Sequence, residues 1–237
     1  YGYRDFSEAS LELASKMIRA NPKSAKIARA LLQKVTIRNN SADHASYLKL
    51  ADSLRTQGLY NDAISEYARL GPIVQKSPGS PHAKIVEIWP IYCYIKLYET
   101  YSKAALKDAR YKAAAGKIFN TAMQTVKKLD EKPPARQTNE YSLYKLIRAL
   151  LRVQYARQYE QSGNELKAAE FYRQSVLEVT EGIVSARVGL DWLPESLLMA
   201  GGAYEKLSLN EAAINVYKQV SIFYKGSKWA IESKKRL

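Results

Sequence analysis

The sequence is poor in the residues that build disulfides, metal sites and most catalytic centres. Its 237 residues include one cysteine, Cys93, and two histidines, His44 and His82. A single thiol cannot form an internal disulfide, and the apolar, aromatic stretch around Cys93 favours a buried, inert thiol. The histidines have no partner at the four-residue spacing of a helical metal site. We therefore expect no metal, no cofactor and no enzymatic activity.

The sequence also lacks an apolar run long enough to span a membrane. Even the apolar segment 85–101 is interrupted by Glu87, Pro90, Lys96 and Glu99, whereas a membrane-spanning helix needs about 20 mainly apolar residues. Hydrophobic residues make up 46% of the chain and charged residues 25%, a balance typical of folded rather than disordered proteins. The composition therefore predicts a folded chain without a transmembrane segment.

Acidic residues are outnumbered by basic ones. There are 37 Lys and Arg against 23 Asp and Glu, a formal net charge of +14. Such an excess favours acidic partners, whether proteins, nucleic acid or an anionic membrane surface. Two groups of basic residues form a candidate basic patch: Lys145, Arg148, Arg152, Lys234, Lys235 and Arg236. The alternative is a solvated, mostly positive exterior.

What the sequence has in abundance is a recurring pattern of small and large residues. In three copies a small residue is followed three positions later by a large one, twelve later by Ala and sixteen later by Tyr. The copies comprise Ala51, Leu54, Gly58, Ala63 and Tyr67; Ala156, Tyr159, Gly163, Ala168 and Tyr172; and Gly201, Tyr204, Ser208, Ala213 and Tyr217. This spacing predicts two antiparallel helices joined by a tight turn, with the small residues at the helix contact. Repeated helix pairs predict a stacked α-solenoid, an architecture that usually binds other proteins.

These residues resemble the tetratricopeptide repeat (TPR) family. The resemblance implies an all-α fold, an α-solenoid of about five antiparallel helix pairs forming a TPR-like superhelix, with a C-terminal capping helix from Trp229. We expect a single repeat domain over 1–237, with clear repeats at 44–75, 149–180 and 194–225 and degenerate pairs at 7–38 and 85–130. The wide spacing of the expected turns predicts middle helices longer than the family's usual length.

The resemblance also implies a non-catalytic scaffold for protein–protein interaction. Family members that bind chaperone tails hold a C-terminal carboxylate with Lys and Asn on the groove-facing side of the first helices. The groove-facing positions of this chain lack those residues, and the candidate partner-binding residues there are Leu48, Asp52, Arg55, Val153, Arg157, Glu160, Leu198 and Glu205. Their mixed character favours a helical or extended peptide. The alternative is that they line a solvated groove.

The segment 203–237 is similar to bacterial cell-envelope TPR proteins, including the lipoprotein of the outer-membrane barrel-assembly machinery and the periplasmic coordinator of the Tol system. Before the last helix those proteins usually read Tyr-Pro-x-Ser, where this chain has Tyr224, Lys225, Gly226 and Ser227. The similarity implies a subunit of a larger assembly in the periplasm or at the outer membrane, with the cytoplasm as the alternative. The other candidate function is a nucleic-acid-binding helical repeat that uses the basic surface. No helix-turn-helix, RNA-recognition or zinc signature accompanies the charge.

Overall fold

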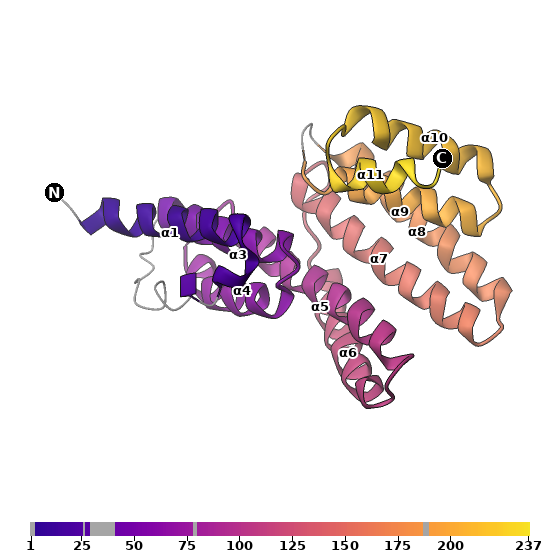
Figure 1. Cartoon of the computed structure of the whole chain (residues 1–237), viewed down its shortest axis with the longest axis horizontal. Helices are drawn as coiled ribbons and strands as arrows, with labels where there is room; N and C mark the ends of the chain where they lie inside the picture. Colours follow the sequence, from indigo (N-terminus) through magenta and orange to yellow (C-terminus); the bar gives the residue numbers. More distant parts are fainter. Residues whose placement is uncertain (1–2, 26, 29–40, 78–79, 187–189) are drawn as a thin grey trace. The chain divides into compact units, whose positions relative to one another are not determined.

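The computed structural model of the chain describes residues 3–25, 27–28, 41–77, 80–186 and 190–237. Within these ranges the chain forms ten α-helices and one short 3-10 helix, and it contains no strand (Figure 1). The second helix expected for the first pair falls largely outside the described residues. The chain divides into two compact units, one ending at Thr125 and the other beginning at Val126, and each is described by itself. The single domain over 1–237 stays a prediction.

The first unit consists of helices that pack on one another. It contains α1 (Tyr3–Ala20), the 3-10 helix (Pro22–Ser24), α3 (Ser41–Thr56), α4 (Tyr60–Gln75), α5 (Ala83–Ala105) and most of α6 (Arg110–Glu131). Helix α3 contacts both α1 and α4, and α4 contacts α5. Two aromatic pairs join α5 to α6, with ring centroids 4.6 Å apart for Tyr98 and Phe119 and 5.7 Å apart for Tyr101 and Tyr111.

The second unit contains two helix pairs and a terminal helix. Its helices are α7 (Asn139–Gln161), α8 (Glu165–Ser185), α9 (Leu193–Lys206), α10 (Asn210–Phe223) and α11 (Lys228–Lys234). The α7–α8 pair has the most extensive contact in the described chain. Side-chain oxygens of Thr138, Asn164 and Ser227 accept hydrogen bonds from backbone N–H groups in the first turns of α7, α8 and α11, which satisfies donors that a helix start otherwise leaves unpaired.

The predicted turn recurs in all three clear repeats. Gly58, Gly163 and Ser208 adopt left-handed backbone conformations with φ of 77°, 74° and 58°. In each turn the next residue donates its backbone N–H back to the helix, as Leu59 does to the carbonyl of Leu54 at 3.0 Å. This is the Schellman arrangement that ends many helices. The left-handed region favours glycine, and Ser208 is the one residue of the three that is not glycine.

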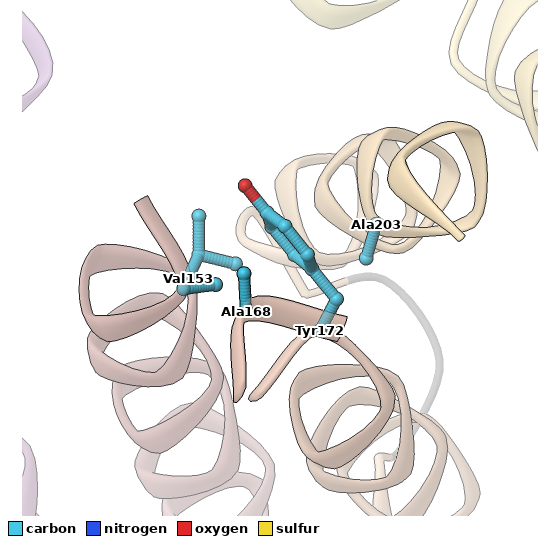
Figure 2. Close-up of a cluster of buried hydrophobic side chains, with 5 residues drawn as sticks. Val153, Ala168, Tyr172 and Ala203 are labelled. Atoms are coloured by element: carbon cyan, nitrogen blue, oxygen red, sulfur yellow. The ribbon is translucent and has the colours of Figure 1, made fainter. Parts of the chain in front are cut away.

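The small and large residues of the pattern pack as predicted. Figure 2 shows Tyr172 of α8 extending between Val153 and Ala168 on one side and Ala203 of α9 on the other. All four are buried, and Val153, the most exposed of them, has 7% of its surface accessible. Because small side chains let neighbouring helices approach, one tyrosine fills the space between successive pairs.

The all-α fold of antiparallel helix pairs is therefore confirmed. The middle helices are also longer than their neighbours, as the turn spacing predicts: α5 to α8 have 21 to 23 residues, whereas α9 and α10 have 14 each. The C-terminal helix predicted to begin near Trp229 is α11.

Candidate interaction surfaces

The last tyrosine of each repeat places its hydroxyl beside a carboxylate of the paired helix. Tyr67 donates a hydrogen bond to Asp52 Oδ1 at 2.5 Å, and Tyr172 donates to Glu160 Oε2 at 2.9 Å. Burial, assisted by this carboxylate, raises the pKa of each phenol, because both effects favour the neutral hydroxyl. The tyrosines therefore stay protonated donors at neutral pH.

The third repeat has the same arrangement with an additional contact. Tyr217 hydrogen-bonds Glu205, and Arg236 Nη1 donates to the Tyr217 hydroxyl at 3.2 Å. Arg236 also pairs with Glu205 at 3.0 Å. Gly202 lies beside this arginine, and a Cβ there would lie 3.5 Å from Arg236 Nη1, an ordinary contact.

Each carboxylate also has a cation, and the cation comes from a different place in each repeat. Arg55 reaches Asp52 at 3.3 Å from the same helix, whereas Lys206 of α9 reaches Glu160 at 2.9 Å from the next pair. Arg236 follows α11. Three tyrosine–carboxylate–cation triads therefore join neighbouring helices, and most of the predicted groove-facing charges belong to them.

The first triad is the most enclosed. The Arg55 guanidinium lies 3.4 Å from the centroid of the Trp89 ring, and only 11% of its side chain is exposed. The nearby Cys93 thiol is fully buried, and burial raises its pKa to about 12. A thiol held neutral in this way is a poor nucleophile, which agrees with the inert cysteine expected from the sequence.

The other groove-facing positions differ in how much surface they offer. Leu48 and Leu198 are half-buried and Arg157 is exposed. Val153 is buried in the cluster of Figure 2 and offers little surface. A partner-binding role for the groove-facing set stays a prediction, with Leu48, Arg157 and Leu198 its most accessible members outside the triads.

The basic patch is largely charge-paired within the second unit. Lys145 pairs with Glu178 at 2.7 Å and with Glu181 at 2.6 Å. Arg148 pairs with Glu178 and with Asp130, both at 2.8 Å. These two cations join α7 to α8 and to the end of α6, so little of their charge is left for a partner.

The C-terminal members of the patch are paired to different degrees. Arg236 contacts Glu205 and, at 3.5 Å, Glu232, and Lys235 also lies 3.5 Å from Glu232. Lys234 is exposed in the last turn of α11. Of the six predicted residues, Arg152 and Lys234 have no carboxylate partner in the part of the chain that the structure describes.

Arg152 lies beside a group of aromatic rings that sequence reasoning missed. Phe171 stacks on Tyr159 with centroids 5.4 Å apart and on Tyr155 at 5.3 Å, with interplanar angles of 11° and 27°. Arg152 lies 5.8 Å from the Phe171 centroid and Lys167 lies 5.3 Å from that of Tyr159. These five residues form what we call the α7–α8 aromatic surface.

This surface follows from local helix geometry. Arg152, Tyr155 and Tyr159 lie at helical spacing on one face of α7, where residues three or four apart are neighbours. The tight turn after Gln161 brings Phe171 of α8 alongside. All three rings are half-buried, and no described carboxylate pairs with Arg152 or Lys167. The spacing on α7 was the available signal, but Phe171 could be added only once the helices were paired.

Neither a metal site nor a membrane span is found in the described ranges. No group of three or more His, Cys, Asp or Glu residues there could hold a metal ion. No helix described for this chain is both long and apolar enough to cross a membrane.

The comparisons with known proteins include one described structural neighbour among several matching solved structures. No family model and no curated sequence matches the chain. A Podosopora anserina protein, described as a kinesin light chain with nearly identical TPR-like repeats, is similar in structure at 18% identity. The match covers 96% of this chain and 95% of that one, with a TM-score of 0.37. Because that score is below 0.5, we assign the fold from the chain's own features. Its paired helices, recurring turns and repeated contacts are those of a TPR-like helical repeat.

Proposed function

We propose that this chain is a non-catalytic protein-interaction scaffold whose α7–α8 aromatic surface binds an acidic segment of a partner. The supporting observation is the position of Arg152 and Lys167. Both lie over half-buried rings and lack a described carboxylate, whereas Lys145 and Arg148 on the same helix pair are paired with acids. Arginine and aromatic residues are the types that most often dominate binding energy at interfaces.

The rigidity of the helix pair favours such binding. Both helices have capped N-termini, and ion pairs and stacked rings join them, so the surface is formed before the partner arrives. A preformed surface loses little conformational entropy on binding. The net charge of +14 would also attract an acidic partner over longer distances and raise the association rate.

The proposal is tested by reversing one charge on the surface. The chain, Arg152→Glu and the control Lys218→Glu would each be recovered from native cells with bound partners. Lys218 is exposed on α10, outside the surface, so the control makes the same charge change elsewhere. We expect Arg152→Glu alone to lose the partner, with a cost of about 2 kcal/mol or more if it is central to the interface.

Three results would count against the proposal. Recovery of the wild-type chain only as a free monomer would contradict a scaffold. Equal loss of partner in both variants would mean that net charge, rather than this surface, controls binding. Retention in both would contradict binding at this surface, and Arg157→Glu would then test the groove-facing residues.

The second candidate function is nucleic-acid binding, which the same surface favours for a specific reason. Single-stranded nucleic acid binds where aromatic rings stack with bases and cations follow the backbone. Binding of this kind weakens steeply as salt rises, with a slope set by the number of phosphates neutralised. The test is a salt titration with single-stranded RNA and DNA, and a flat response or no binding at low salt would exclude it.

The setting that we propose is a larger assembly of the bacterial cell envelope, which rests on the similarity of the last repeat to envelope TPR proteins. Fractionation of native cells into periplasm, membrane and cytoplasm would test it. A chain found wholly in the cytoplasm would contradict this setting and leave the scaffold role open.

A further inference from the structure

A recess in the first unit has no role in the proposed function. It lies between α1 and α3 and has a volume of about 190 Å³. Its lining consists of Glu12, Ser15, Lys16, Arg19, Ser46 and Lys49. The two serines are buried, with 3% and 8% exposed, whereas the four charged residues are exposed. The lining therefore combines two buried serines with four exposed charged residues.

The charges that line the recess do not balance. There are three cations and one carboxylate, and that carboxylate pairs with Lys16 at 3.0 Å. Arg19, which lines the recess, donates from Nε to the Ser53 hydroxyl at 3.1 Å, which holds its side chain against α3. In the described part of the chain, neither Arg19 nor Lys49 has a carboxylate partner within ion-pair distance. The lining thus carries a local excess of two positive charges.

We propose that this recess binds a phosphate monoester group. A phosphate monoester carries about −1.5 to −2 charges at neutral pH, which matches the excess of two cations. A carboxylate or a phosphodiester carries a single charge and would neutralise only half of it. Arginine and lysine are also donors that hold phosphoryl oxygens in proteins. The site lies in the first unit and does not depend on the proposed function.

The group could belong to a phosphorylated side chain of another protein or to a small free phosphate, and the experiment distinguishes the two. Amide NMR spectra of the isotope-labelled whole chain are recorded during titration with inorganic phosphate, with a phosphoserine tripeptide and with its unphosphorylated form. Ionic strength is held constant with chloride. We expect saturable shifts confined to α1 and α3 with both phosphates, larger than those with acetate or dimethyl phosphate. Tighter binding of the tripeptide assigns the site to a modified protein, whereas equal binding assigns it to a free phosphate.

Three variants separate this site from general attraction of anions. Lys49→Ala should weaken phosphate binding about two- to fivefold, the range for an exposed ion pair. Glu12→Gln should strengthen it, because it removes the competing carboxylate. Lys103→Ala should leave it unchanged, since Lys103 is exposed at the end of α5, outside the recess. Shifts that do not saturate, shifts spread over the chain, or equal weakening by Lys49→Ala and Lys103→Ala would overturn the proposal.

Discussion

Replacing Gly201 with alanine should destabilise the third repeat, although alanine is the better helix former. An ideal Cβ at Gly201 would lie 2.4 Å from Cε1 of Tyr217 and 2.9 Å from its Cδ1 and Cζ. These distances are far below van der Waals contact. The Tyr217 ring cannot easily move away, because it is fully buried and its hydroxyl is held by Arg236. Overpacking of this kind costs about 1–3 kcal/mol.

The neighbouring glycine provides a matched control. A Cβ at Gly202 would meet Arg236 Nη1 at 3.5 Å and the Tyr217 hydroxyl at 3.9 Å, which are ordinary contacts. Alanine is more favourable than glycine inside a helix by about 1 kcal/mol at either site. This gain cancels when the two variants are compared, so the difference in stability between them measures the clash alone.

The assay is native-state hydrogen exchange of the amides in α9 and α10, which reports the free energy of opening of this repeat. Gly201→Ala should open more readily than Gly202→Ala by about 1–3 kcal/mol, and Gly202→Ala should be at least as stable as the wild type. If Gly201→Ala were as stable as Gly202→Ala, glycine would not be required for the close approach of these helices.

Three further predictions concern the turns, the thiol and a buried phenol. In chemical denaturation, Ser208→Gly should raise the free energy of unfolding by about 1 kcal/mol because it relieves a left-handed serine. Gly163→Ser should lower the free energy of unfolding by a similar amount. An unchanged free energy of unfolding in both variants would mean that the left-handed backbone at these turns does not require glycine. Cys93 should resist an aromatic disulfide reagent in the native chain at neutral and mildly alkaline pH and react once urea unfolds it, and rapid native labelling would refute its burial. Burial, assisted by Glu205, raises the pKa of Tyr217 to about 12, above an unfolded value of about 10. The stability from this phenol is therefore fully present below about pH 10 and is lost as pH rises towards 12. Tyr217→Phe should therefore flatten the decline of stability at alkaline pH. Identical declines in the wild type and the variant would refute this prediction.

Much of the fold was predictable because it depends on local spacing. The offsets of the repeats place small residues where helices touch, and the left-handed turns after the first helices occur at the expected positions, Gly58, Gly163 and Ser208. Proline usually kinks a helix or lies in its first turn, and Pro90 lies inside α5. Sequence alone could not decide this, because the contacts of α5 with α4 and α6 are between residues distant in the chain.

The candidate site was less predictable, because charge pairing depends on residues far apart in sequence. Lys145, Arg148 and Arg152 lie on one helix face as expected, yet the first two are neutralised by Glu178, which follows them by about thirty residues. Arg152 differs from them only because Phe171, and not an acid, lies opposite it. Nothing within α7 itself distinguishes these three cations.

The sequence by itself determined the helices, their pairing and the tyrosine of each repeat, because these follow from spacing along one chain segment. Tertiary structure decided what each tyrosine hydroxyl contacts. The carboxylate lies one position after the first small residue of the repeat at Asp52, but four positions after it at Glu160 and Glu205. The cation that pairs with it comes from the same helix in the first repeat, from the next helix pair in the second and from the chain end in the third. Hydrogen bonds and ion pairs require only that the groups meet in space, so packing between helices, rather than spacing within them, fixed these contacts.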